Sequence, residues 1–318
     1  MQSQSERTQT DQRTRMLEEP VGPLIRTLAG PNILSMLVTS IYNMADTYFV
    51  SQINTSASGA VGIVFSAMAL IQAAGFTVGT GSGAMTARLL GSNQRQRANE
   101  TASSGVLLAL VFGVLIAAVG LLNLDELIWL LGSTETIHPY AAEYAFYILL
   151  GAPVMTLSFT MSNLLRWQGR ANLAAVGLTI GGVLNMILDP IFIFSMGMGI
   201  GGAGAATLLS QMISMSILAS MFLRKKGDVR LHPAYISKSP HTYITILKQG
   251  APSFFRQGVT SFAAMATNYN ARIYGDAAVA ALAIVSKVFM VINSITIGFG
   301  RASSLCWALT TARAARTG

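Results

Sequence analysis

The chain has 318 residues, of which 52% are hydrophobic and only 11% charged, and its formal net charge is +8. A soluble domain carries about 25% charged residues, so this composition excludes an ordinary soluble protein and favours a membrane protein. The single cysteine, Cys306, excludes a disulfide within the chain, and the three histidines lack metal-ligand spacing. With no pairing of a nucleophile and a base either, we expect neither an enzyme nor a cofactor.

Eight hydrophobic segments follow one another along the chain. Because lipid offers no partners to bare backbone groups, each segment is predicted to be a membrane-crossing helix. A transmembrane barrel is disfavoured, since the segments are too long and show no alternation of period two. The first, second, fourth and eighth are long enough to cross at a tilt. The segments run over 24–50, 59–86, 101–123, 139–165, 171–196, 203–223, 250–271 and 277–300.

The loops between these segments alternate in charge. Basic residues gather in the N-terminal segment and in the second, fourth and sixth loops, whereas the odd loops hold Asp125, Glu126, Glu135 and Asp276. Basic loops stay in the cytoplasm. We therefore predict a multi-pass protein of the cytoplasmic membrane with a cytoplasmic N-terminus. This topology accounts for the positive charge, so the expected partner is the lipid bilayer and not nucleic acid, and no obligate protein partner is indicated.

The sequence repeats itself without a gap at a spacing of 221 residues. Pro31 falls on Pro252, Tyr48 on Tyr269 and Gly79 on Gly300. Repeats of this size in a membrane protein indicate a transporter. Because six helices separate the copies, both enter the membrane from the same side and are parallel. We predict an all-α polytopic membrane protein with a six-helix N-terminal lobe and the first two helices of a second, parallel repeat.

This organisation divides the chain into five predicted parts. They are a cytoplasmic N-terminal segment (1–23), the six-helix lobe (24–223), a cytoplasmic inter-lobe loop (224–249), a partial second lobe of two helices (250–300) and a tail (301–318). The segment 124–131, with Trp129, is expected to lie at the outer membrane surface, because tryptophan is enriched there.

Polar side chains inside membrane helices are costly, so they indicate a functional site. Three predicted helices carry polar residues one turn apart: Thr39, Asn43 and Asp46 in the first, Asn185 and Asp189 in the fifth, and Thr207 and Gln211 in the sixth. At about 1.5 Å per residue, Asp46, Asp189 and Thr207 fall at one depth in the outer half of the membrane.

Oxygen atoms at one depth suit a hard cation, which prefers oxygen ligands. We therefore predict a site for H⁺ or Na⁺, with Na⁺ as the possible metal, at Asp46, Asn185, Asp189 and Thr207. In the repeat, position 46 falls on Thr267, so this site belongs to the first lobe. The predicted cavity-lining residues are Thr39, Asn43, Gln211 and Lys287.

A purely structural explanation stays open for each of these groups. Pro190 frees a backbone carbonyl and bends its helix, and Asn185 and Asp189 would then only satisfy that break. Asp46 lies near the outer end of its helix, where it would reach water. Three interpretations of Lys287 stay open: its side chain pairs with an acid, faces the cavity or extends to the membrane–water interface.

Two stretches resemble a known family. Tyr42–Val50 (YNMADTYFV) and Asn185–Phe194 (NMILDPIFIF) are similar to the first and fifth helices of the multidrug and toxic compound extrusion (MATE) family, within a similarity over residues 24–300. The resemblance implies a secondary active transporter with twelve helices in two six-helix lobes. Such a protein exports drug-like, amphipathic and often cationic compounds in exchange for H⁺ or Na⁺. It also implies that Asp46, Asn185, Asp189 and Thr207 match the polar cluster of the N-terminal lobe.

The chain departs from the family pattern in two places. Some branches carry an acid in the seventh helix, where this chain has Gln257 and Thr260. After Gly300 the family continues with a Gln-Gly-Phe-Gln-Pro type sequence, and loss of one nucleotide there would produce residues 301–318 out of frame. Two alternative functions follow: a non-functional truncated fragment of such a transporter, or a flippase of lipid-linked precursors. A flippase cavity is expected to hold phosphates with several Arg and Lys.

Overall fold

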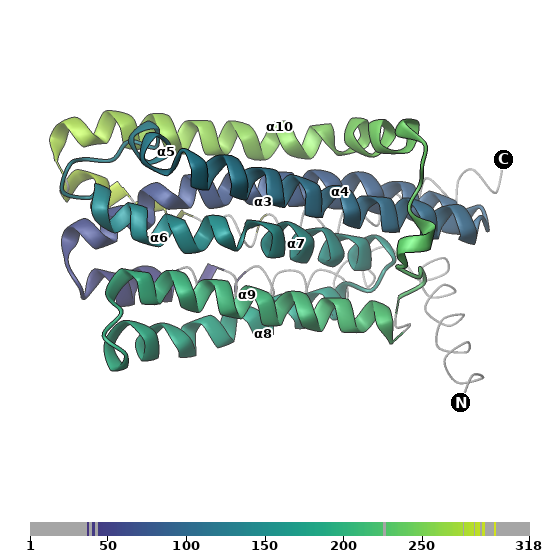
Figure 1. Cartoon of the computed structure of the whole chain (residues 1–318), viewed down its shortest axis with the longest axis horizontal. Coiled ribbons are helices and arrows are strands. Elements are labelled where there is room, and N and C mark those ends of the chain that lie inside the picture. The colour runs from purple at the N-terminus through teal and green to yellow at the C-terminus, as the bar shows by residue number, and fades with distance from the viewer. Residues whose placement is uncertain are drawn as a thin grey trace.

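The computed structural model describes residues 37, 40, 41, 44–224, 227–275, 277–282, 284–286, 288, 289 and 296. Every regular element in these residues is a helix, which confirms the predicted all-α fold class. The helices run side by side along the long axis of the molecule, with α10 on one side and α8 and α9 on the other (Figure 1).

The first described helices follow the predicted segments closely. Residues 44–51 are helical and form the N-terminal helix, and α3 (Thr55–Gly91), α4 (Arg95–Leu122) and the short α5 (Leu124–Leu130) come next. Asn54 begins α3 because its side-chain oxygen accepts a hydrogen bond from the backbone N–H of Ala57 at 2.7 Å. Helix α3 is the centre of the bundle, since it packs against α4, α7 and α10.

The fourth predicted segment, 139–165, is not one continuous helix, so that prediction is wrong. It forms α6 (His138–Leu150) and α7 (Ala152–Trp167), which meet at an angle of 52°. Gly151 separates the two helices, and Pro153 lies in the first turn of α7. Proline has no N–H to continue the hydrogen-bond ladder of α6 but is well tolerated in a first helical turn, which explains the break.

The fifth and sixth segments form a helical pair that is interrupted near its connection. Helix α8 (Ala171–Pro190) passes directly into the π-helical turn η1 (Ile191–Ser195), and α9 (Gly199–Leu223) returns beside α8. Pro190 cannot donate to the preceding turn, so the regular ladder ends there. Turns of π-helix inside longer helices occur frequently at functional sites.

The segment between α9 and α10 lies against the neighbouring helices. The Arg170 guanidinium contacts the Asp228 carboxylate at 3.0 Å, and the N–H of Ser237 donates to Oγ of Ser104 at 2.9 Å. A short 3₁₀ turn, η2 (Pro233–Tyr235), contacts α4, and α10 already begins at Pro240. The predicted loop 224–249 therefore ends too late along the chain, since residues 240–249 are already helical. They were assigned to the loop because the first turns of α10 are polar and do not resemble a membrane segment.

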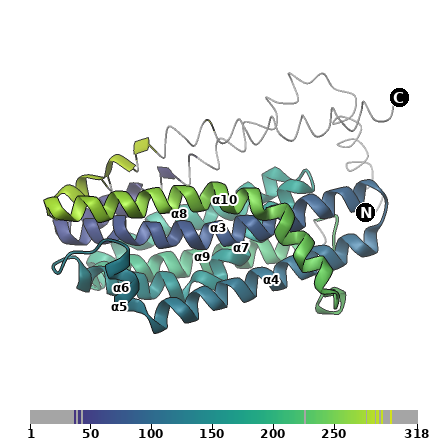
Figure 2. The same ribbon diagram turned by 90° about the horizontal axis from the view of Figure 1, so that it is seen from above.

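Helix α10 (Pro240–Ala271) lies along α3, as Figure 2 shows from above, and leads into η3 (Arg272–Tyr274) and a helical segment at 277–282. Near one end the two backbones touch: a Cβ atom on Gly81 would meet the carbonyl of Ile246, and one on Gly250 would meet the carbonyl of Thr77. Only glycine, which has no Cβ atom, allows the two backbones to approach so closely.

Several helices have the length and apolarity to cross a membrane. They are α3, α4, α8 together with η1, and α9, with the bent pair α6–α7 as a further broken crossing. Helix α4 leaves Leu115, Val119 and Leu122 more than half exposed, as expected for a lipid-facing surface. The protein is a multi-pass membrane protein.

The charged turns lie at the two ends of this bundle. We call the end with Asp125, Glu126 and Glu135 the acidic-loop end. The opposite end, with the turns at 92–94 and 168–170 and the segment 227–239, is the basic-loop end.

Candidate cation-coupling site

The amide of Asn185 connects α8 with α9. Its Nδ2 donates to Oδ1 of Asp189 at 3.1 Å, one turn further along α8, and lies 3.3 Å from Oγ1 of Thr207 on α9. These three side chains are 1%, 0% and 3% exposed, respectively. Both hydrogen bonds run between side chains and not to a backbone carbonyl freed by Pro190. This geometry therefore disfavours the explanation that Asn185 only pairs with backbone groups left free at the helix break.

Asp46 joins the same region from the N-terminal helix. Its Oδ2 accepts a hydrogen bond from the hydroxyl of Tyr144, on α6, at 3.1 Å. Asp46 is 5% exposed, so it does not simply reach water, and Tyr144 is fully buried. The two carboxylates interact electrostatically with each other, and each also interacts with the Tyr144 hydroxyl. Four helical elements thus contribute polar groups to one buried region.

Two oxygen atoms of this cluster have unused hydrogen-bonding capacity. Within the described part of the chain, Oδ1 of Asn185 and Oδ2 of Asp189 are buried and accept no hydrogen bond. Buried polar atoms are almost always paired, so each such atom calls for an explanation. A bound cation is one, because carboxylate and amide oxygens are suitable ligands and the charge of a buried carboxylate requires compensation.

The other predicted residues are only partly placed. Gln211 lies one turn after Thr207 on α9, and its Oε1 is buried without a hydrogen-bond partner among the described residues. Thr39, Asn43 and Lys287 lie outside the described residues. The described residues contain no group of three or more His, Cys, Asp or Glu side chains that could hold a metal ion. A site for Na⁺ here would depend on mixed carboxylate, amide and hydroxyl ligands.

A comparison with protein families decides the classification. The family description MatE matches residues 31–191, which is more than half of the chain and includes the helices of Asp46, Tyr144 and Asp189. The chain belongs to the MatE family. This confirms the membership that the two sequence motifs indicated.

Individual MatE relatives agree with this assignment. The "FAD transporter" of Shewanella oneidensis is 30% identical over 66% of this chain and 47% of its own length. The "Multidrug export protein MepA" of Staphylococcus saprophyticus is 24% identical over 80% of this chain and 56% of its own. A solved structure titled "Outward-facing conformation of a multidrug resistance MATE family transporter of the MOP superfamily" is 28% identical, with a TM-score of 0.83 over 94% of this chain and 67% of that chain. The chain spans about half the length of the curated relatives it matches.

Two residues of this MatE chain were not found by sequence reasoning. Tyr144 carries no signal of its own, because a tyrosine in an apolar segment usually belongs to the core. Arg256 did carry a signal: it is a charged residue inside the predicted seventh helix, where ionisable side chains indicate function. The structure places Arg256 near the middle of α10, with its side chain exposed.

Proposed function

We propose that the protein is part of, or acts as, a secondary active efflux transporter that exports amphipathic, often cationic compounds in exchange for H⁺ or Na⁺. Membership of the MatE family and the transporter and exporter names of the relatives support this proposal. The observation that carries the coupling is the buried contact of Asp189, Asn185 and Thr207, with Asp46 close by.

The proposed mechanism follows from the cost of burying charge. Two carboxylates in one buried region repel each other, and each is disfavoured in its charged form. A cation bound among the oxygens of Asp46, Asn185, Asp189 and Thr207 removes both penalties. Its binding therefore favours the arrangement of the N-terminal helix and α8 in which these oxygens lie close together.

Alternating access requires that this arrangement differ between the two states of the transporter. A ligand shifts a conformational equilibrium only by its difference in affinity for the two states. In the proposed cycle, cation entry from outside stabilises the state that releases substrate, and cation release inside restores the other state. The interruption at Pro190 and η1 supports this reading, because a broken ladder lets the end of α8 move with Asp189.

Accumulation of ethidium in cells, with and without each ion gradient, tests this function. Cells that express the wild-type chain are expected to accumulate less ethidium when the H⁺ or the Na⁺ gradient is present. Asp46→Asn is expected to abolish this difference while its membrane level stays unchanged. Glu126→Gln, which removes an exposed acid at the acidic-loop end, serves as the control and should export normally. Normal gradient-driven export by Asp46→Asn would refute the proposed coupling role.

A further inference from the structure

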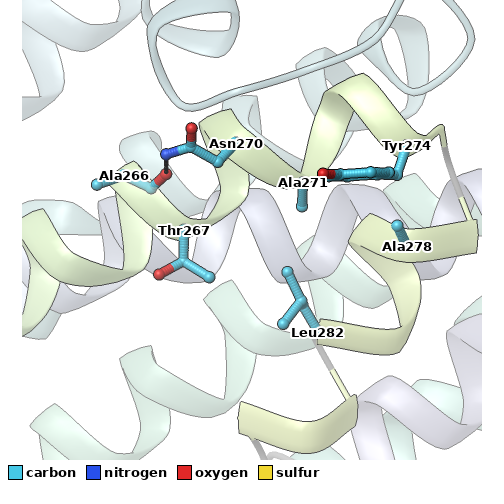
Figure 3. Close-up of a pocket in the computed structure, with 7 residues that line it drawn as sticks. All are labelled: Ala266, Thr267, Asn270, Ala271, Tyr274, Ala278 and Leu282. Atoms are coloured by element: carbon cyan, nitrogen blue, oxygen red, sulfur yellow. Dashed lines mark hydrogen bonds between the residues drawn. The ribbon is translucent and has the colours of Figure 1, made fainter.

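The proposed cycle needs a route between the buried carboxylates and the basic-loop end. Asp46 and Asp189 are buried, and hydrocarbon is a costly environment for a charged group. An open cavity of about 460 Å³ lies beside Thr267 and Asn270, but its lining comes from α10, η3 and the segment 277–282 (Figure 3). None of these elements carries a residue of the candidate coupling site, so this cavity is not the route.

Two buried serines of α7 have unused hydrogen-bonding capacity. Ser158 and Ser162 are 0% and 1% exposed, and within the described part of the chain neither Oγ atom forms a hydrogen bond. Thr160, between them, is equally buried, but its hydroxyl donates to the carbonyl of Gly75 on α3 at 3.1 Å. Buried polar atoms are almost always paired, and water is the usual partner where the protein supplies none.

The two serines face α9. Each is two residues from Thr160, about 200° around the helix, so both lie on the side of α7 opposite α3. Leu165, two turns after Ser158, lies on this side as well and belongs to one buried apolar cluster with Phe222 of α9. Since α7 packs directly on α9, the two serine hydroxyls point towards the space between these helices.

Helices α7 and α9 run in the same direction and in register. A Cβ atom on Gly151, directly before α7, would lie 3.2 Å from the side chain of Leu208. The same number of residues further along each helix, Leu165 and Phe222 share the apolar cluster. Positions on α7 and α9 can therefore be compared by their height along the bundle.

Gln211 lies between the coupling site and these serines. It is one turn after Thr207 on α9, about 40° around the helix from it. This direction falls between Thr207, which faces α8, and Gly204, which contacts Tyr147 of α6. One turn further towards the basic-loop end, α7 takes the place of α6. The Oε1 atom of Gln211 is buried and has no hydrogen-bond partner among the described residues.

These groups form a row along the bundle. From the coupling site towards the basic-loop end it consists of Thr207, Gln211, Ser158 and Ser162. Successive members are about 6 Å apart in height, a separation that one or two bridging waters span. Neutral amide and hydroxyl oxygens hold a cation less tightly than carboxylates do, which suits passage better than binding. Arg166 follows one turn later near the end of α7, and its positive charge disfavours a cation trapped there.

We propose that Gln211, Ser158 and Ser162 line a hydrated path along which the coupling cation passes between the carboxylates and the basic-loop end. This inference rests on the proposed cation coupling and assigns its route on one side of the site. A proton would move along the waters and hydroxyl groups, and Na⁺ would exchange part of its water shell for their oxygens. Because the carboxylates supply the binding, the path determines how fast the site exchanges its cation and not how tightly it holds it.

Exchange of a buried thiol proton in D₂O tests whether water enters the path. Ser158→Cys and Ser162→Cys, each in a Cys306→Ser chain in lipid nanodiscs, carry a single thiol whose S–H band is resolved in the infrared spectrum. Both bands are expected to convert to S–D at once. Thr160→Cys is the matched control, equally buried but facing α3, and should exchange at least about tenfold more slowly because it needs a local opening of the bundle. Equal exchange in all three variants would overturn the path.

Ethidium export from cells tests whether the path serves the carboxylates. Ser162→Val narrows the path and should lower the maximal gradient-driven export rate about tenfold, the effect of one lost polar contact on a rate-limiting step. The cation concentration for half-maximal export should stay unchanged. Ser216→Val, at an exposed position of α9, is the control and should export normally.

The outcomes of the two experiments separate the path from the transport function. Rapid thiol exchange with normal export by Ser162→Val would overturn the role of the path in coupling. A changed half-maximal concentration at an unchanged maximal rate would make Ser162 part of the binding site and would also overturn that role. Absence of gradient-driven export in the wild-type chain would overturn the proposed function itself, whereas thiol exchange would still decide whether water enters the path.

Discussion

The hydroxyl of Tyr144 donates a hydrogen bond to Oδ2 of Asp46 at 3.1 Å and thereby joins α6 to the N-terminal helix. The bond is buried, and 98 residues separate its partners in the sequence. Tyr144 also interacts electrostatically with Asp189, so it is close enough to sense both carboxylates of the proposed coupling site. We therefore propose that Tyr144 positions Asp46.

Tyr144→Phe is expected to shift the cation dependence of export without emptying the site. The substitution keeps the ring in its buried place but leaves Oδ2 of Asp46 without this donor. Loss of a hydrogen bond to a charged group costs about 1.5–3 kcal/mol. Because the hydroxyl donates to the charged carboxylate and so favours its free form, its loss should lower the cation concentration for half-maximal export about tenfold or more, while the maximal export rate changes less. An unchanged half-maximal concentration would exclude a role of Tyr144 in positioning Asp46.

Asn185→Ala is expected to destabilise the protein as well as its coupling. The variant leaves a buried carboxylate oxygen of Asp189 without the donor at 3.1 Å, which costs about 1–3 kcal/mol in the free energy of unfolding. Reversible unfolding in mixed detergent micelles measures this change. Asn172→Ala, on the exposed start of α8, is the matched control and should change stability by less than about 0.5 kcal/mol. Equal effects of the two substitutions would contradict the hydrogen-bond geometry.

Gly250→Ala is expected to separate α10 from α3. The added methyl group would meet the backbone carbonyl of Thr77, which cannot move aside as a flexible side chain can. Overpacking of this kind costs about 1–3 kcal/mol. Gly258→Ala, on the same helix but with open space around its Cβ position, should be neutral or slightly stabilising. Thermal unfolding of both variants checks the difference, and a stable Gly250→Ala protein would argue against the close approach of these helices.

Asp228→Asn is expected to have a small effect on stability. The pair of Arg170 and Asp228 is close, at 3.0 Å, but Asp228 is partly exposed, with a side-chain exposure of 34%. Exposed ion pairs contribute about 0–1 kcal/mol, and salt screens them. The variant should therefore unfold within about 1 kcal/mol of the wild type and lose even this difference at high salt. A loss above 2 kcal/mol would mean that the segment 227–239 depends on this pair far more than its exposure suggests.

Part of the fold could be predicted because hydrophobic length determines where helices cross a membrane. The starts and ends of α4, α8 and α9 lie within six residues of the predicted segments. The break at Gly151 was missed because α6 and α7 are both apolar, so hydropathy runs through the bend. The early start of α10 was missed because its first turns are polar and project beyond the hydrophobic segment.

The candidate site shows what helical spacing can and cannot reveal. Asn185 and Asp189 are one turn apart, so the sequence alone places them on one face of α8, and depth pairs them with Thr207. Tyr144 shares α6 with Tyr140, Glu143 and Tyr147, so helical spacing does not single it out, and only the folded bundle brings it to Asp46. Contacts between helices depend on how the bundle packs, and the periodicity of a single helix contains no information on that packing.

The central claim is that the carboxylates of Asp46 and Asp189 bind the coupling cation. Infrared difference spectroscopy of the purified chain, recorded on changing the pH or adding Na⁺, measures the state of buried carboxyl groups directly. We expect a cation-dependent carboxyl band in the wild-type chain that is lost in both Asp46→Asn and Asp189→Asn and retained in Asp125→Asn. A band that persists unchanged in both Asp46→Asn and Asp189→Asn would contradict the account.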